Sequence, residues 1–455
     1  MPALHKRPLH HPKRRLPVRR KNLRDRPPLQ PLDLLIAVHQ RKPQPLRHRA
    51  PDRRLSRAHE AHEVKVHVSR VHVRPTPQRR PPPLPIAKNS PPLRSSRFIP
   101  AMPAPRYDFA SDNTAGLCPE ALAALTEANT SRAPSYGDDP WTARARTRFR
   151  EIFETECDVF FVFNGTAANA LALSACCRAP HTRILCHEFS HIDTDECGAP
   201  EFFTGGAKIN PLPGPAGKLQ PATVEAALRR GHGVHYPKPA ALSLTQSTEL
   251  GTVYTPAEIS ALAAVAHAHG LAVHLDGARF ANALASLQHP QTPTPAPQTP
   301  LSPADLTWRA GVDVLCLGGT KNGLLNTEAV LFFNRDLARD FDYRVKQTGQ
   351  LASKMRFAAA QWCAVLENDT WLRHAAHANT QARRLAAGLR SLPDIRLLFE
   401  PEANGVFVEM PPARYDALTA RGWQFYRFIG DHGYRLMCSW ATTDADNDAF
   451  LADAR

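Results

Sequence analysis

An aspartate and a lysine, each close behind an apolar run, are the residues of this sequence whose types and positions best suit chemistry. Asp276 follows the run 271–275, and Lys321 follows the run 312–317 within the glycine-flanked turn GGTKNG. A lysine that forms a Schiff base, paired with a carboxylate that keeps a pyridinium nitrogen protonated, is what pyridoxal 5'-phosphate (PLP) chemistry requires. Alone, such an Asp is more often a turn residue and such a Lys a surface charge, so the prediction rests on the pair.

The pattern around the pair predicts the sheet edge that would position it. Apolar runs alternate with helical segments, which is typical of an α/β fold with a mostly parallel sheet; these runs are 159–163, 240–244, 271–275, 312–317 and 329–333. Open sheets of this kind bind ligands at the carboxyl ends of their strands. The clearest helix starts at a capping box, Thr255 to Glu258, and ends before Gly270, directly ahead of the strand that carries Asp276.

The turn after the first apolar run is a candidate phosphate site. The run 159–163 ends in Asn164-Gly165-Thr166-Ala167, and a helix is predicted from Ala168. A glycine at a strand-to-helix turn leaves backbone N–H groups free at the positive end of a helix. The segment matches neither the GxGxxG nor the Walker pattern, so it gives no support to dinucleotide or ATP binding.

A second turn, CHEFSHIDTDECGA, gathers His187, His191, Asp193, Asp195 and Glu196 and suggests a metal site. The two histidines are four residues apart in a turn and lack a further matched pair of ligands. We therefore predict no metal here. For His191 we favour an aromatic face lying on a cofactor ring, with a purely structural histidine as the alternative.

Composition separates the first 101 residues from the rest of the 455-residue chain. They hold 25 Lys and Arg against 5 Asp and Glu, so the chain's net charge of +15 comes from this segment and the body is mildly acidic. With 19 prolines and no glycine, the segment is predicted to be disordered. We favour an upstream extension from a misassigned start. The alternatives are a genuine tail, a targeting segment or a nucleic-acid-binding arm, which without aromatic residues before Phe98 would bind only non-specifically.

The remaining composition predicts a soluble cytoplasmic protein. The nine cysteines all lie in the body without paired metal-ligand spacing, as expected of reduced thiols. No apolar run approaches the roughly 20 residues that span a bilayer. A Pro/Thr/Gln tract at 288–303 is predicted to be a surface loop insertion.

Taken together, the motifs SDN, YGDD, NGTAAN, SHI, LDGARF, GGTKNG, KMR and RLMCSW resemble those of the low-specificity L-threonine aldolase and β-eliminating lyase family. The resemblance covers about residues 106–450 and implies the aspartate-aminotransferase-like PLP fold. It implies a PLP-binding large domain at 102–350 and a smaller C-terminal α+β domain at 351–455. It also implies retro-aldol cleavage of threonine-, allo-threonine- or phenylserine-type L-amino acids to glycine and an aldehyde, by a homodimer or homotetramer.

The resemblance assigns roles to individual residues. Lys321 would be the Schiff-base lysine, Asp276 the pyridinium partner and His191 the stacking residue. The phosphate and the substrate carboxylate would be held by two further groups: Gly165, Thr166 and Arg356 for the phosphate, and Ser111, Arg279 and Arg435 for the carboxylate. Many relatives have a histidine where this chain has Gln246, which cannot act as a base, so water, His191 or another group would remove the β-hydroxyl proton.

Two rival functions follow from other features. Another PLP reaction, a β-elimination or a transamination, would use the same lysine and aspartate. A nucleic-acid-binding protein would instead work through the basic first segment.

Overall fold

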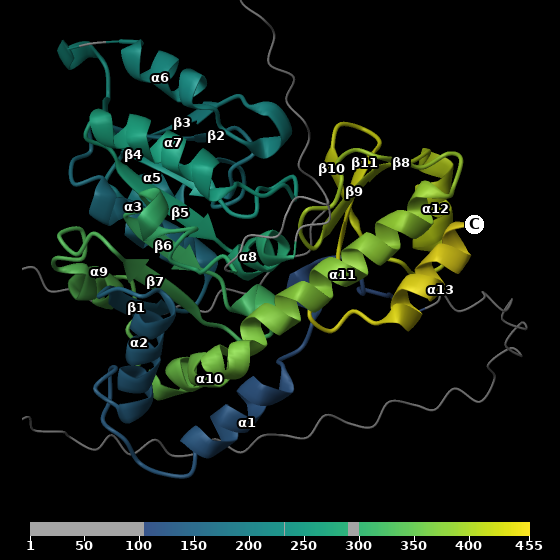
Figure 1. The fold of residues 1–455 in the computed structure, drawn as a ribbon, viewed down its shortest axis with the longest axis horizontal. Helices are drawn as coiled ribbons and strands as arrows, with labels where there is room; N and C mark the ends of the chain where they lie inside the picture. Colours follow the sequence, from purple (N-terminus) through teal and green to yellow (C-terminus); the bar gives the residue numbers. More distant parts are fainter. Residues whose placement is uncertain (1–103, 232, 290–299) are drawn as a thin grey trace, which may run out of the picture. The chain divides into compact units, whose positions relative to one another are not determined.

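The computed structural model describes residues 104–231, 233–289 and 300–455 (Figure 1). The chain divides into two units, Met1–Pro92 and Leu93–Arg455. The first unit lies outside the described residues, and so does 290–299, the greater part of the predicted insertion.

A seven-stranded sheet forms the larger part of this unit. Its strands are β1 (Asp158–Val162), β2 (Thr182–His187), β3 (Lys208–Leu212), β4 (Lys238–Thr245), β5 (Ala272–Gly277), β6 (Val314–Leu317) and β7 (Glu328–Phe332). The strand order is β1-β7-β6-β5-β4-β2-β3. Within this sheet β7 alone runs in the opposite direction to the other strands, so the start of β7 lies at the same edge as the ends of β1 and β6. The predicted mostly parallel sheet is confirmed.

Helices pack on both faces of this sheet, which explains why its strands are continuous apolar runs. On β6, Val314 and Cys316 pack with α3, whereas Leu315 and Leu317 belong to the cluster that contains α7. The helices are α1 (Pro119–Ala128), α2 (Pro140–Ile152), α3 (Gly165–Cys176), α4 (His191–Thr194), α5 (Ala199–Phe203), α6 (Pro221–Arg229), α7 (Pro256–Ala268), α8 (Phe280–Gln288), α9 (Phe341–Gln347) and α10 (Arg356–Leu366). The predicted capping box at the start of α7 is present, with Thr255 and Glu258 bonded reciprocally.

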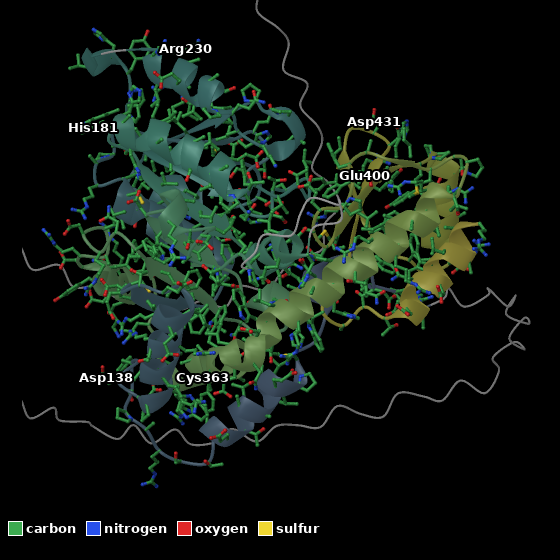
Figure 2. All side chains as sticks on the ribbon, in the orientation of Figure 1. Asp138, His181, Arg230, Cys363, Glu400 and Asp431 are labelled. Carbon is green, nitrogen blue, oxygen red and sulfur yellow. The ribbon has the colours of Figure 1, made fainter. Side chains whose placement is uncertain are left out.

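The long helix α11 (Thr370–Arg390) leads from α10 to a smaller C-terminal sheet (Figure 1). This antiparallel sheet has the order β10-β11-β9-β8. Its elements are β8 (Arg396–Leu397), β9 (Gly405–Glu409), β10 (Tyr426–Ile429) and β11 (Gly433–Met437), with α12 (Pro412–Ala420) and α13 (Asp444–Ala454) beside them. Figure 2 shows Asp431 at the turn between β10 and β11, and Cys363 on α10. A smaller α+β part is thus present, while the exact boundary at 350/351 stays a prediction.

Candidate active site

The carboxyl ends of β4, β5 and β6 place Asp276 at the centre of the sheet edge. In the parallel register, Asp276 lies between Thr245 on β4 and Cys316 on β6. Its side chain is buried, with one carboxylate oxygen accepting from the Ala278 N–H at 3.0 Å and the other from the Asn169 amide at 3.0 Å. A buried carboxylate with only neutral donors is able to accept a further, charged donor at this position.

Lys321 lies in the short 3-10 helix η5 (Thr320–Asn322). The two glycines before this helix have no side chain, which lets the turn pack closely against neighbouring backbone. A Cβ on Gly318 would stand 2.4 Å from the Ala278 carbonyl oxygen, and one on Gly319 would stand 2.5 Å from the Thr327 carbonyl oxygen. Gly323 closes the turn at φ 95°, a conformation that favours glycine. Close packing therefore fixes the backbone that presents the lysine.

Asp276, Lys321 and the start of α3 line one cavity of about 220 Å³. The helix α3 follows β1, and the Asn164 side chain caps it by accepting the Ala167 N–H at 2.8 Å. Within the described ranges the N–H groups of Gly165 and Thr166 have no protein acceptor. Outside its own helix and chain neighbours, no heavy atom of the described residues lies within 4 Å of the position that a Cβ on Gly165 would take, so a ligand has room to approach.

The order of these groups along the sheet edge fits PLP. Asp276 on β5 suits the ring nitrogen, Lys321 after β6 suits the aldehyde carbon on the opposite side of the ring, and the α3 N-terminus after β1 suits the phosphate. The residues present therefore match the donors and acceptors of this cofactor in kind and in order.

His191, the first residue of α4, lines the same cavity. Its Nδ1 lies 3.0 Å from Glu196 Oε1, and Asn169 donates to that same oxygen at 2.8 Å. Asn169 therefore links Glu196 to Asp276. The hydrogen bond to Glu196 raises the pKa of His191 above its usual value, and burial raises the pKa of Glu196.

The residues expected at the substrate carboxylate lie beside this cavity. Arg279 donates to the Asp112 carboxylate at 2.7 and 2.9 Å, and both side chains are buried. Arg435 faces the same crevice as Arg279, and its buried Nε has no hydrogen-bond partner among the described residues. Ser111 caps η1 (Asp112–Thr114) and is not among the residues that line either space in the described structure.

The buried Asp112–Arg279 ion pair is expected to contribute to the free energy of unfolding. Although burial would raise it, the pKa of Asp112 is lowered to about 2, first by the charge of Arg279 and then by that of Lys321. We expect Asp112→Ala to lower the free energy of unfolding in urea by about 3–5 kcal/mol, because it leaves a buried guanidinium unpaired. Glu409→Ala, which breaks the exposed pair with Arg396, is the control and should cost less than about 1 kcal/mol. Equal effects of the two substitutions would contradict this interpretation.

The side chains of Gln246 and Arg356 both form hydrogen bonds with residues outside the cavity. Gln246 is fully buried, and its side-chain amide bonds both the N–H and the carbonyl of Tyr254, at 3.0 and 2.8 Å. It is therefore structural. Arg356 begins α10 and donates to the Ala128 carbonyl at 3.2 Å, and in the described structure it does not line the cavity.

Sequence reasoning missed three buried polar residues of this site: Asn169, Glu196 as the partner of His191, and Glu328. Asn169 lies in the buried run 168–175 of α3, and Glu328 begins an otherwise apolar strand. A polar side chain in a buried run is costly unless it is paired or functional, which is the signal that would have found them. The described residues contain no group of three or more His, Cys, Asp or Glu able to hold an ion. Among the helices of the described ranges, none is long and apolar enough to cross a membrane.

The chain is similar to several known proteins in sequence and in fold. The low specificity L-threonine aldolase of Pseudomonas aeruginosa is 55% identical to the chain over 334 residues, which are 73% of this chain and 93% of the relative. The solved threonine aldolase of Leishmania major matches with a TM-score of 0.70 and 30% identity, covering 77% of this chain and 98% of that one. The serine palmitoyltransferase of Sphingomonas wittichii, 17% identical with a TM-score of 0.57 over 76% of this chain and 85% of that one, shares the fold.

The fold is that of the PLP-dependent enzymes of fold type I. Residues 108–412 match the family described as beta-eliminating lyase, and the chain belongs to this family.

Proposed function

We propose that this protein is an aldehyde-lyase that cleaves L-β-hydroxy-α-amino acids of the threonine, allo-threonine and phenylserine types to glycine and an aldehyde, with PLP as its cofactor. The observation that carries the proposal is the order of Asp276, Lys321 and the α3 N-terminus along one cavity. The 55% identity to a low specificity L-threonine aldolase supports the choice of reaction.

Four groups of the chain would hold the cofactor. Lys321 would bind its carbonyl carbon covalently, and Asp276 would keep its ring nitrogen protonated. The N–H groups of Gly165 and Thr166 would bind its phosphate. When bound, PLP supplies an electron sink that stabilises negative charge at the substrate Cα.

The two buried arginines would orient the substrate. Asp112 occupies Nε and Nη2 of Arg279, whereas Nε of Arg435 lacks a partner in the described part of the chain. We therefore assign the substrate carboxylate chiefly to Arg435, with Arg279 fixed by Asp112 as the second cation. Holding the carboxylate there fixes which bond to Cα faces the ring. On the family resemblance alone, we also propose Ser111 for the substrate carboxylate and Arg356 for the phosphate.

His191 would remove the proton from the β-hydroxyl, since both polar groups of the Gln246 amide are occupied. A histidine base must be neutral, so activity is lost as the pH falls through the pKa of His191. That pKa is raised by the hydrogen bond to Glu196, so we expect Glu196→Gln to move the acid limb of the kcat/KM profile to lower pH. Asp195→Asn, at the exposed carboxylate 3.6 Å from His191 Nε2, is the control and should move the limb far less. An unmoved limb in Glu196→Gln would rule out His191 as the base.

A homodimer or homotetramer is part of the proposal. It is supported by large exposed apolar side chains at Leu325 after the lysine turn, Leu122 on α1 and Tyr136 in the YGDD loop. We also propose a cytoplasmic location, which the nine cysteines support because none of them, all in described residues, forms a disulfide.

The product decides between this function and its rival. We expect the full chain, purified with PLP, to release glycine and an equal amount of aldehyde from L-threonine or L-phenylserine. A keto acid with ammonia, or transfer of the amino group, would instead assign another PLP lyase or an aminotransferase.

A further inference from the structure

Glu328 is a buried carboxyl group inside the cavity that no step above uses. It is the first residue of β7, it is 6% exposed, and it lines the same cavity as Lys321. Its Oε2 accepts the Gly319 N–H at 2.6 Å. In the described part of the chain it forms no ion pair, so its burial is not balanced by a salt bridge.

The sheet topology places Glu328 at the phosphate end of the cavity. Because β7 runs antiparallel to β1, Glu328 lies opposite Val162, three residues before Gly165. On its other side its carboxylate bonds the turn that carries Lys321. Glu328 thus lies between the two loops, and two strands away from Asp276 at the opposite end of the cavity.

An ionised carboxylate repels a nearby phosphate, whereas a neutral carboxylic acid can donate a hydrogen bond to it. Burial raises the pKa of Glu328 to about 7, against contacts with Thr320 and Gly319 and the charge of Lys321. A bound phosphate would raise this pKa further, because a nearby like charge disfavours the ionised form. The other titratable groups facing this position are the Cys316 thiol on β6, whose pKa burial raises, and more distantly Asp276 and His191.

We propose that Glu328 is a cofactor-binding residue that, as a neutral carboxylic acid, donates a hydrogen bond to the phosphate of PLP. The inference rests on the proposed function and adds a residue to it. It also makes cofactor retention depend on pH. The protonated form binds, so the contribution of Glu328 is complete below its pKa in the free protein, about 7, and is lost as the pH rises through the higher pKa of the complex.

The test is the equilibrium affinity of the cofactor-free full chain for PLP and for pyridoxal, which lacks the phosphate, between about pH 6 and 9. Glu328→Gln keeps a neutral donor of the same shape at every pH. We expect the ratio of the PLP dissociation constants, wild type over Glu328→Gln, to rise about tenfold across this range. The same ratio for pyridoxal should stay constant. Glu400→Gln, at an exposed carboxylate paired with Arg390, is the matched control and should leave both affinities unchanged (Figure 2).

Three results would overturn the inference: a ratio for PLP that does not change with pH, Glu328→Gln binding PLP about tenfold more weakly even at the lowest pH, or an equal rise with pyridoxal. The second would show that the ionised carboxylate is needed, and the third that Glu328 acts on Lys321. If Glu328→Gln fails to fold, Glu328→Met serves instead, and it should weaken PLP binding at low pH and remove the same pH dependence. A wild-type chain that binds no PLP would refute the proposed function itself, whereas binding with a flat ratio refutes only the role of Glu328.

Discussion

Replacing Lys321 by alanine is expected to abolish glycine release, lowering kcat by at least about 10³-fold. The substitution removes the amine that would hold the cofactor covalently and leaves the tight turn around Gly318 and Gly319 intact. The measurements are glycine release from L-threonine and the visible absorbance of the lysine-bound cofactor. Both should disappear together, while thermal unfolding of the cofactor-free protein should stay close to that of the wild type.

Lys238→Ala is the matched control for this experiment. Lys238 is an exposed lysine at the start of β4, at the opposite edge of the sheet from the cavity. The control should keep full activity. Turnover in Lys321→Ala at more than about a tenth of the wild-type rate would contradict the assignment of Lys321.

The second large effect is expected for Asp276→Asn, which should lower kcat by about 10²–10³-fold. The substitution is nearly isosteric, but it removes the negative charge that would keep the ring nitrogen protonated. We expect the cofactor still to bind through Lys321, so the visible absorbance should remain while glycine release falls. That separation of binding from turnover distinguishes this variant from Lys321→Ala.

Asp431→Asn makes the same chemical change at an exposed position between β10 and β11 and should leave kcat unaffected (Figure 2). Asp276→Glu keeps the charge and should be more active than Asp276→Asn. If Asp276→Asn and Asp431→Asn had the same kcat, Asp276 would not be the residue that keeps the ring nitrogen protonated. That result would contradict the proposed placement of the cofactor in the cavity.

Several features of this protein were predictable from the sequence because they depend on local patterns. Apolar runs of strand length, the capping box of α7 and the glycines around Lys321 each act within a few residues. Because parallel strands end at one edge of a sheet, those patterns also predicted that Asp276 and Lys321 would share a site. The cavity that both residues line agrees with this prediction.

The partners of these residues were not predictable, because they come from distant parts of the chain. Asn169 reaches Asp276 across 107 residues, and Asp112 reaches Arg279 across 167. Family resemblance suggested Arg279 as a substrate ligand without showing that a buried aspartate already holds it. The carboxylate of Glu328 likewise gains its place only through the antiparallel pairing of β7 with β1.

The sequence alone was therefore enough to predict the fold class, and it suggested the two residues at the centre of the proposed chemistry. The tertiary structure decided which neighbours set their charge, that Gln246 is structural, and that Arg356 stands outside the cavity. The physical reason is that hydrophobic periodicity records which side of an element is buried, whereas pKa values and hydrogen-bond partners depend on what the rest of the chain brings to that side.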